Sequence, residues 1–567
     1  MFKILAIFAL LFLVPSAQAQ AIDGPLSVPN NRFGIHIVDE NDLDDAARLV
    51  NSTGGDWGYV KLVIREDDRK VEKWQQAFDK MRRLHLIPIV RLATRIENGR
   101  WIKPRVEDID SWMDFLSSLN WVTENRYLIL FNEPNHAKEW GDEINPEEYA
   151  YFAKEFSTRL KNRNVDFFIL PAGLDASAPN SSQTLDEAEF IRRMYQADKQ
   201  IFSYFDGWTS HSYPNPDFSA SPFQSGRGSL KTYLWELGIL ANYGFYPDKI
   251  FITETGWAHN QERNNGYLSP TLVADYYKTA FSQSWNDSRI VAITPFLLNY
   301  QDELFGRFSW KKLNSKEFYP MFETVQILPK IKGKPKQRKI VKFDTFRIPE
   351  TLVINSKYNL YLGLENLGQA IVGENDNWAI EYNGLDHFTI DSDGVPLIEP
   401  NNKSRLSLKL KTPSDFKKYN YSIRLLYKNE EVNAFKKSLT LIPPPSLAIF
   451  LKKWINKPAI GDNYRLLIYD ENEILIYQKA NLAVEGGFVE VTDLYGVIPD
   501  RPYRIVVLKD YYLPRQVKIV IGQVRTGIEV PILLPLDFSN DEVFNFSDLV
   551  AFFRNPITNL KRLLALD

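Results

Sequence analysis

The feature that most constrains this chain is a strand-then-helix unit that recurs between about residues 31 and 309. In each unit a short β-branched or aromatic run is followed by polar turn residues and then by a stretch with helical periodicity. Strands that alternate with helices pack as a parallel sheet, because each helix returns the chain to the same edge. We therefore expect an α/β domain here.

The unit occurs eight times. We predict strands over residues 33–38, 58–64, 87–93, 127–131, 167–170, 207–210, 250–253 and 291–297. Helical patterns lie between them, for example over residues 71–84, 106–119, 147–161 and 272–285. Eight such units over about 280 residues are typical of a (β/α)8 TIM barrel. An open, doubly wound sheet is the alternative, but no glycine-rich phosphate motif follows the first strand to favour it.

Length and composition set further bounds. A chain of 567 residues is too long for one core, which indicates several domains. The formal net charge of −3 argues against nucleic-acid binding, which normally requires a basic excess. With no cysteine, the chain has no disulfide framework, catalytic thiol or cysteine zinc site. The 14% aromatic content suits a sugar-binding protein and equally a tightly packed β protein.

The N-terminus has the pattern of a signal peptide. Lys3 supplies a positive charge, residues 4–14 form an apolar run, and Ala17-Gln18-Ala19 fits the cleavage pattern. The apolar run is short for a bilayer-spanning helix. We predict a signal peptide over residues 1–19 and a secreted or cell-surface protein, with an uncleaved anchor as the alternative.

The second half of the chain follows other patterns. We place the barrel domain at residues 22–328 and a basic linker, PKIKGKPKQRK, at 329–339, with contact to an anionic polymer as an alternative role for that run. Alternating apolar and polar residues then predict an Ig-like β-sandwich over 340–445 and a transthyretin-like sandwich over 446–535. Residues 536–567 form a separate tail.

Two carboxylates follow buried strands of the predicted barrel. Glu133 ends the run LILFNE at the fourth strand, and Glu254 ends FITE at the seventh. Barrel active sites lie at the carboxyl ends of the strands, so both should face the barrel mouth. Two carboxyls facing each other there should have their pKa values pushed apart, which suits one acid and one base or nucleophile.

Asn132-Glu133-Pro134 at strand four, together with Glu254 at strand seven, resembles the clan A retaining (β/α)8 glycoside hydrolases, which include cellulase-like and β-xylosidase-like families. The resemblance covers roughly residues 31–310. It implies that Glu133 is the acid/base, that Glu254 is the nucleophile, and that Asn132 holds the sugar 2-hydroxyl. Because the residue before a proline favours extended backbone, we also expect Pro134 to keep Glu133 extended.

Other positions agree with this resemblance. His211 and Tyr213 in WTSHSYP lie on one side of strand six, similar to the clan's His-x-Tyr pair. Arg91 on strand three is favoured over Arg65 as the cation that keeps Glu254 ionised. Four histidines lie in or just after predicted strands, and His36 is one of the candidate substrate-binding residues. The four are His36, His136, His211 and His259.

The aromatic residues expected in the sugar subsite match the family's pattern less closely than the carboxylates do. Trp257 is expected to form the floor of the subsite where the bond is cut, with core packing as the alternative. The last strand ends in PFLLNY, without the tryptophan that many members place there. Phe296, Tyr300 or Trp310 would have to substitute, so the sequence does not identify the sugar.

The tail DFSNDEVFNFSD carries oxygen side chains at the spacing of an EF-hand-like calcium loop. The candidate ligands are Asp537, Ser539, Asp541, Asn545 and Asp548. The segment resembles one half of a dockerin, which implies a cell-surface or cohesin-like partner. Glu542 stands where the turn favours glycine, and one repeat is present where dockerins have two, so the alternatives are weak calcium binding and a metal-free vestige.

Together these patterns predict a secreted, monomeric, multidomain protein. It should consist of a TIM barrel, two all-β sandwich modules and a short α-helical tail. The expected activity is retaining hydrolysis of β-glycosidic bonds in a poly- or oligosaccharide, without a cofactor for catalysis. The alternatives are a catalytically silent carbohydrate-binding or scaffold protein, and a barrel hydrolase or lyase acting on a non-sugar substrate.

Overall fold

The computed structural model describes residues 24–260, 267–344 and 348–564. The predicted signal peptide lies outside these residues. The chain divides into two compact units, with the boundary between Arg338 and Lys339. In the described part, no helix combines the length and apolarity needed to cross a lipid bilayer.

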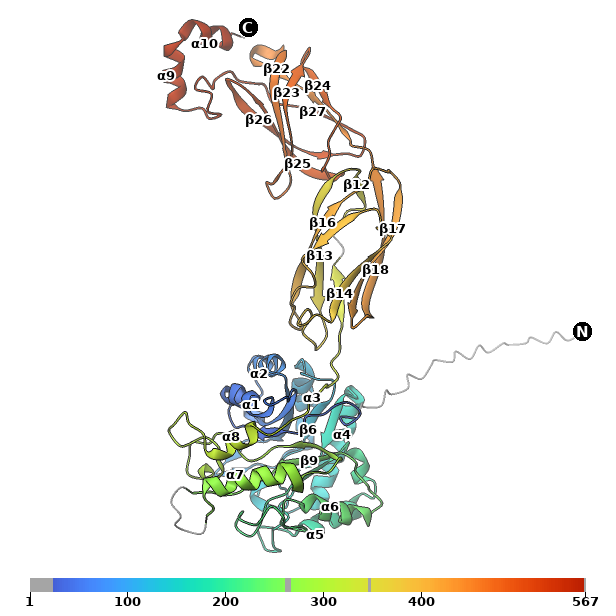
Figure 1. The fold of residues 1–567 in the computed structure, drawn as a ribbon, viewed down its shortest axis with the longest axis vertical. Helices are drawn as coiled ribbons and strands as arrows, with labels where there is room; N and C mark the ends of the chain where they lie inside the picture. Colours follow the sequence, from blue (N-terminus) through green and yellow to red (C-terminus); the bar gives the residue numbers. More distant parts are fainter. Residues whose placement is uncertain (1–23, 261–266, 345–347, 565–567) are drawn as a thin grey trace, which may run out of the picture. The chain divides into compact units, whose positions relative to one another are not determined.

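The first unit is an α/β domain with parallel strands (Figure 1). Each of the eight predicted runs falls on a strand of this domain. The strands are β1 (Gly34–His36), β2 (Gly58–Arg65), β3 (Leu86–Ala93), β6 (Arg126–Ile129), β7 (Phe167–Leu170), β8 (Trp208–His211), β9 (Ile250–Glu254) and β10 (Ile290–Ile293). A two-residue hairpin, β4 (Ile96–Glu97) with β5 (Arg100–Trp101), was not predicted.

Helices connect these strands and pack around them (Figure 1). They are α1 (Leu43–Val50), α2 (Val71–Arg83), α3 (Ile109–Ser118), α4 (Pro146–Arg163), α5 (Glu187–Ala197), α6 (Thr232–Ala241), α7 (Pro270–Thr279) and α8 (Pro320–Gln326). A π-helical turn, Ala280–Ser284, extends α7. The strands are buried almost throughout, which explains why they read as continuous apolar runs.

The parallel strands form two sheets. One has the order β1-β2-β3-β6-β7, and the other has the order β10-β9-β8. An isolated parallel bridge joins Phe33 to Ile293, beside β1 and β10. A second parallel bridge joins Asp175, after β7, to His211 of β8. The two isolated bridges thus join residues in or next to the outer strands of the two sheets.

The basic segment expected as a linker lies along the α/β domain up to Arg338. The Lys330 ammonium donates to the carbonyl oxygens of Val325, Gln326 and Leu328 at 2.8–2.9 Å. These carbonyls lie at and just after the C-terminal end of α8, where a cation is favoured by the helix dipole. Arg338 pairs with Asp166 at 2.6 Å. Lys330 and Arg338 of this segment therefore attach it to the α/β domain through a hydrogen-bonded ammonium group and an ion pair.

The second unit begins with two four-stranded sheets that share one hydrophobic core. Their orders are β11-β13-β16-β15 and β12-β18-β17-β14. The strands are β11 (Val341–Asp344), β12 (Thr351–Val353), β13 (Lys357–Asn366), β14 (Trp378–Asn383), β15 (Thr389–Ser392), β16 (Lys403–Lys411), β17 (Lys418–Tyr427) and β18 (Glu430–Ile442). Alternate residues of β13 and β16 are buried, as the alternating sequence predicts.

A second core lies between the sheets β24-β19-β27 and β23-β22-β25-β26. The strands of these two sheets are β19 (Ser446–Phe450), β22 (Gly461–Tyr469), β23 (Leu475–Val484), β24 (Phe488–Val491), β25 (Arg501–Lys509), β26 (Tyr512–Ile521) and β27 (Arg525–Glu529). The short strands β20 (Lys452–Lys453) and β21 (Lys457–Pro458) pair with each other. Two short helices, α9 (Phe546–Arg554) and α10 (Pro556–Leu563), follow. The protein thus combines an α/β domain, extensive β structure and a short helical tail.

Candidate active site

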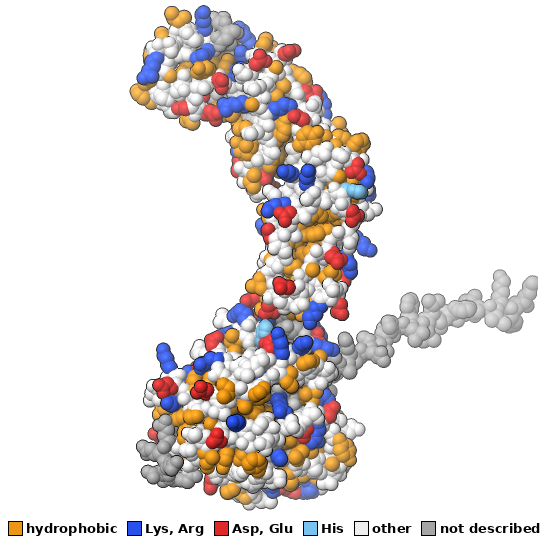
Figure 2. Space-filling model, in the orientation of Figure 1, with side chains coloured by type: hydrophobic (Ala, Val, Ile, Leu, Met, Phe, Trp, Pro, Cys, Tyr) orange, Lys and Arg blue, Asp and Glu red, His pale blue; other side chains and the backbone are white. Residues whose placement is uncertain are grey.

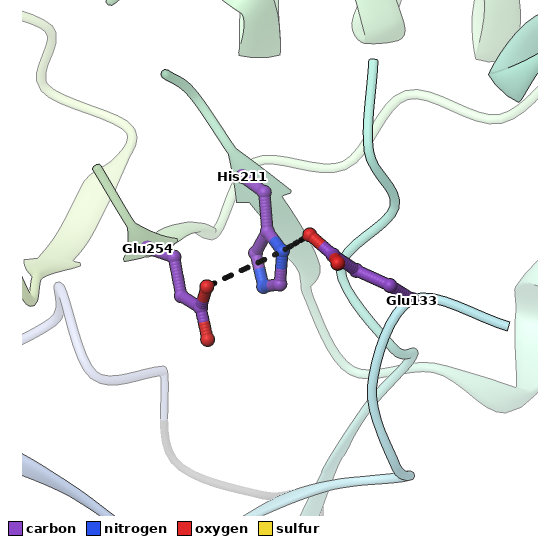
Figure 3. A group of neighbouring side chains, drawn as sticks. All are labelled: Glu133, His211 and Glu254. Carbon is purple, nitrogen blue, oxygen red and sulfur yellow. Dashed lines mark hydrogen bonds and ion pairs between the residues drawn. The ribbon is translucent and has the colours of Figure 1, made fainter. Parts of the chain in front are cut away.

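Three side chains converge at the carboxyl ends of the parallel strands (Figure 3). Glu254 is the last residue of β9, His211 is the last residue of β8, and Glu133 follows β6 by four residues. His211 Nδ1 lies 2.7 Å from Glu133 Oε1 and 3.8 Å from Glu254 Oε2. One carboxylate oxygen of each glutamate and one ring nitrogen of His211 lie within 4.8 Å of one another. The fold thus brings both predicted carboxylates together.

Both oxygens of Glu254 accept hydrogen bonds from charged or polar side chains. Lys61, in the middle of β2 and fully buried, donates to Oε1 at 2.7 Å. The Tyr213 hydroxyl donates to Oε2 at 3.1 Å. Burial opposes ionisation of Glu254, but the positive charge of Lys61, together with weaker electrostatic contributions from neighbouring groups that include Arg91, holds the pKa of Glu254 well below its usual range. Glu254 is therefore an ionised carboxylate.

Arg91, rather than Arg65, is a cation that helps to keep Glu254 ionised, as the sequence favours, but Arg91 is not the cation that contacts Glu254. Arg91 lies on β3 and is buried, but Lys61 makes the direct ion pair with Glu254. Arg91 contributes a weaker electrostatic attraction to Glu254 from a greater distance. Arg65, the alternative, is exposed at the end of β2 and pairs with Asp67 at 2.7 Å. Lys61 makes the contact because its long side chain extends from the middle of β2 to the Glu254 carboxylate at the end of β9.

His36 and Asn132 each leave one buried polar atom without a hydrogen-bond partner in the described part of the protein. These atoms are His36 Nδ1 and Asn132 Oδ1. Burial and the nearby Lys61 charge lower the pKa of His36 well below its usual value, so its ring is neutral. Asn132 Nδ2 donates to Glu139 at 3.4 Å. Buried polar atoms without partners are costly unless a ligand satisfies them.

The expectation of an extended backbone at Glu133 was wrong. Glu133 has a φ of +30°, in the left-handed region that non-glycine residues rarely adopt. Two backbone hydrogen bonds impose this turn: Glu133 N–H donates to Gly173 O at 3.0 Å, and His136 N–H donates to Glu133 O at 2.8 Å. Strained backbone of this kind persists where surrounding contacts fix it, often at functional sites.

The expected aromatic floor is not formed by Trp257. Its side chain is 1% exposed, packs against Tyr276 and Tyr277 of α7, and donates from Nε1 to Ala220 O at 2.8 Å. Trp310 is equally buried. Phe296 and Tyr300 are half-buried, and both rings contact Phe305. Of the aromatic residues named from the sequence for the subsite, Phe296 and Tyr300 are therefore the ones with accessible surface.

Several site residues were missed by the sequence analysis. Lys61 was signalled by a charge inside the buried run GYVKLVI. Glu139 lies close enough to Glu133 for burial and the Glu133 charge to raise its pKa. His136 was noted only by its position after strand four, and its Nε2 lies 2.9 Å from Asp175. The sequence carries no signal for the Asp175 contact, which depends on tertiary packing.

Gly173 follows β7 and lies against His211. A β-carbon at this position would be 2.9 Å from His211 Cγ and closer still to two other ring atoms. Its carbonyl also accepts the Glu133 N–H. Only glycine therefore allows His211 and the Glu133 turn to occupy their observed positions.

We expect Gly173→Ala to lower kcat on any substrate by about 10–100-fold, because misplacing a catalytic group by 1 Å costs on that order. Steady-state kinetics would measure the change, and Gly238→Ala, where an added β-carbon meets nothing within 4 Å, is the matched control. Equal rates for both variants would show that the position of His211 is not critical.

A buried carboxyl pair supports the strand that carries His211. Glu236 Oε1 accepts from Ser210 Oγ at 2.8 Å, and Oε2 accepts from Trp208 Nε1 at 2.9 Å. Burial raises the pKa of Glu236 to about 7. Burial and the Glu236 charge raise the pKa of Glu187 well above its usual value. At a pH just above the ordinary glutamate pKa, both carboxyls therefore keep their protons in the folded state, whereas in the unfolded chain they are ionised.

This pair predicts that stability falls as pH rises. Its contribution is fully present below the ordinary glutamate pKa and is lost as pH rises through about 7. Glu187→Gln removes one of the two titrating carboxyls, so we expect Tm to fall less between pH 5 and pH 8 than in the wild type. The difference should be roughly 2–4 °C for each kcal/mol of unfolding free energy that the variant no longer loses at pH 8. Thermal unfolding at the two pH values would measure this. Glu189→Gln, on the same turn of α5, should keep the wild-type pH dependence; identical behaviour of the two variants would contradict the assignment.

The tail loop gathers the five predicted calcium ligands. Ligand atoms of Asp537, Asp541 and Asp548 lie within 4.8 Å of one another. The Asp537 carboxylate accepts the N–H groups of Asp541 and Glu542 at 3.0 and 2.9 Å. Asp548 accepts from Ser539 and Asn545 at 2.7–2.9 Å. Glu542 adopts a φ of +67°, the conformation for which glycine was expected. The donor set suits calcium, although the loop's own donors already occupy much of it.

We expect calcium to bind this loop weakly, in the ~10⁻⁴–10⁻³ M range. Calcium at 5 mM should then stabilise the second unit by about 1–2 kcal/mol through mass action. Calorimetric titration of the full chain would measure binding. Asp541→Asn should abolish the heat, because it removes a negatively charged ligand from the loop. The variant should still fold, because Asp541 is exposed and does not belong to the core. The absence of heat from the wild type would identify a metal-free loop.

No family model and no curated protein matches this chain. Similar solved structures include a family 39 glycoside hydrolase from Bacteroides cellulosilyticus WH2, with TM-score 0.37 and 14% identity over 72% of this chain and 82% of that chain. A monomeric β-xylosidase from Caulobacter crescentus CB15 has TM-score 0.38 and 11% identity over 82% and 94%. A family 128 endo-β-1,3-glucanase from Pseudomonas viridiflava has TM-score 0.36 and 12% identity over 53% and 98%. These neighbours are glycoside hydrolases, and at such low similarity the reaction must be argued from the site.

Proposed function

We propose that this protein is a retaining glycoside hydrolase that cleaves β-glycosidic bonds in a poly- or oligosaccharide. The observation that carries the proposal is the convergence of Glu133, His211 and Glu254 at the strand ends (Figure 3). Glu254 is ionised and held by Lys61 and Tyr213, as a nucleophile requires. Glu133 Oε1 lies at hydrogen-bond distance, 2.7 Å, from His211 Nδ1.

The close approach of the carboxylates supports retention. Oxygens of Glu133 and Glu254 lie within 4.8 Å, while inverting enzymes separate the two carboxyl groups by ~6.5–9.5 Å to seat a water between them. Glu254 attacks the anomeric carbon as the glycosidic C–O bond breaks, and Glu133 gives its proton to the leaving oxygen. Glu133 then takes a proton from water, whose oxygen attacks the same carbon and releases Glu254.

Sugar hydroxyls would satisfy the unpartnered atoms of the site. Asn132 Oδ1 can accept from a hydroxyl next to the reacting carbon, and His36 Nδ1 can exchange a hydrogen bond with another. The half-buried Phe296 ring offers aromatic surface 5.1 Å from the His36 ring, and the half-buried Tyr300 lies on the same segment. This combination of polar atoms and rings suits a pyranose better than a fully apolar substrate.

The architecture proposed for this activity is a closed (β/α)8 barrel. Closure is supported by the parallel bridges Phe33–Ile293 and Asp175–His211, which connect the two parallel sheets. We further propose that the protein is secreted, because residues 1–19 have the pattern of a signal peptide, and N-terminal sequencing of the exported protein would test this.

A panel of β-linked polysaccharides and aryl β-glycosides tests the activity, and ¹H NMR of the first-formed anomer tests the mechanism. We expect hydrolysis with the β-anomer released first. Release of the α-anomer would refute retention. Glycan binding without turnover on any substrate would instead support the alternative of a silent carbohydrate-binding scaffold.

A further inference from the structure

The two C-terminal helices turn their apolar side toward solvent. In α9 the exposed residues Phe546, Leu549, Val550 and Phe553 recur at intervals of three and four, so they form one stripe. In α10 and directly after it, Ile557, Leu560 and Leu564 recur in the same way. We call these seven residues the C-terminal apolar face. Phe546, Phe553 and Ile557 are 77%, 68% and 75% exposed.

The opposite side of these helices is attached to the second unit. Phe552 packs against Phe538 at 5.0 Å between ring centroids. Asn559 is buried and donates to Ala551 O at 3.1 Å, which ties α10 to α9. The Arg562 guanidinium lies over the Tyr511 ring at 3.6 Å. The helices are thus anchored through one side, while their large apolar side chains remain uncovered. Exposed apolar clusters of this kind mark interaction surfaces.

The exposed charges carried by α9 and α10 themselves are positive, while the exposed Asp541 carboxylate accepts a hydrogen bond from Ser547 Oγ at the start of α9 at 3.2 Å. Arg554 and Lys561 are exposed, and Arg562 is half-buried. Within the described residues, the exposed Arg554 and Lys561 side chains form no ion pair. The acidic residue of the two helices, Asp548, is 0% exposed and accepts hydrogen bonds from Ser539 and Asn545. Figure 2 shows hydrophobic and basic side chains next to each other at this end of the chain.

We propose that α9 and α10 dock on the surface of an anionic lipid bilayer, with the C-terminal apolar face inserted among the acyl chains. An apolar stripe flanked by cations is the pattern of helices that lie in a membrane interface. Arg554 and Lys561 would then meet anionic headgroups while the phenylalanines enter the layer beneath. The docking surface consists of second-unit residues and does not depend on the proposed glycosidase activity.

A second copy of the chain fits this face less well than a bilayer does. In a two-fold contact the same patch meets itself, so the cations of one copy would face those of the other. Like charges brought together in this way oppose association. An anionic bilayer instead offers complementary charge together with an apolar layer.

Vesicle flotation of the full chain tests the proposal. We expect binding to phosphatidylcholine vesicles with 30% phosphatidylglycerol, weak binding to pure phosphatidylcholine, and reduced binding at 0.5 M salt. The triple variant Phe546→Ser, Phe553→Ser, Ile557→Ser should lose binding by at least about tenfold, since each substitution removes buried CH₂ groups. Arg554→Gln with Lys561→Gln should weaken binding to the anionic vesicles by about fivefold per cation.

The double variant Phe416→Ser, Tyr246→Ser is the matched control, because these aromatic residues are 66% and 75% exposed elsewhere in the protein. It should bind vesicles like the wild type, and all variants should keep the wild-type Tm. Equal binding by the triple variant, or no binding by the wild type, would overturn the proposal. A wild-type dimer that the triple variant converts to a monomer, without vesicle binding, would assign the face to a second copy.

Discussion

Glu254→Ala should abolish turnover, with a loss on the order of 10⁴–10⁶-fold in kcat, the range seen when a catalytic nucleophile is removed. The reason is that no other described carboxylate is held ionised by a buried cation at the strand ends. Added azide should restore part of the rate, because a small anion can occupy the space of the lost carboxylate and attack the same carbon. Initial rates on an aryl glycoside with and without azide would measure both effects.

Glu133→Ala should behave differently, and the contrast separates the two roles. General acid catalysis contributes about 10²–10⁴-fold, and a leaving group of low pKa needs little of it. The loss should therefore be large on natural glycans and small on dinitrophenyl glycosides. Glu139→Gln is the matched control, because this half-buried carboxyl lies close enough to Glu133 to be affected by its charge and forms no ion pair or hydrogen bond with Glu254 among the described residues, and its loss should be within about tenfold. Equal losses on both substrate types would exclude Glu133 as the acid.

The positions of the strands could be predicted because burial leaves a continuous apolar run in the sequence. The fifth strand has the predicted bounds, Phe167–Leu170, while the last ends at Ile293 rather than at residue 297. The apolar residues Phe296 and Leu297 belong to the segment that continues past the strand. The carboxyl-end rule for parallel strands brought Glu133 and Glu254 together without any side-chain information.

The residues that surround the carboxylates were harder to predict, because their contacts cross between strands. Arg91 and Lys61 lie on neighbouring strands, and only the geometry of the strand ends decides which reaches Glu254. Trp257 follows β9 directly, yet α7 covers it with Tyr276 and Tyr277. At Glu133 the local preference set by Pro134 is overridden by the hydrogen bond to Gly173. In each case tertiary contacts outweigh a local rule.

Lys61→Met should lower kcat/KM at pH 6 by about 100–1000-fold. Methionine has a similar volume, so the main change is the loss of a buried positive charge. Breaking a buried ion pair costs ~3–5 kcal/mol because the remaining charge is uncompensated. Glu254 would avoid that cost by binding a proton, and a protonated carboxyl is not a nucleophile.

The pH dependence distinguishes this electrostatic role from a purely structural one. Burial lowers the pKa of Lys61 to about 8, so in the wild type the ion pair is complete below that pH. Without Lys61, burial acts on Glu254 with less opposition and its pKa rises, so the acid limb of the pH–rate profile should move to higher pH. The variant should therefore recover part of its activity as pH increases. Arg91→Met, which removes a buried cation without a direct bond to Glu254, should shift the limb much less. A Lys61→Met profile that is uniformly lowered but unshifted would mean that Lys61 acts on the fold rather than on the charge of Glu254.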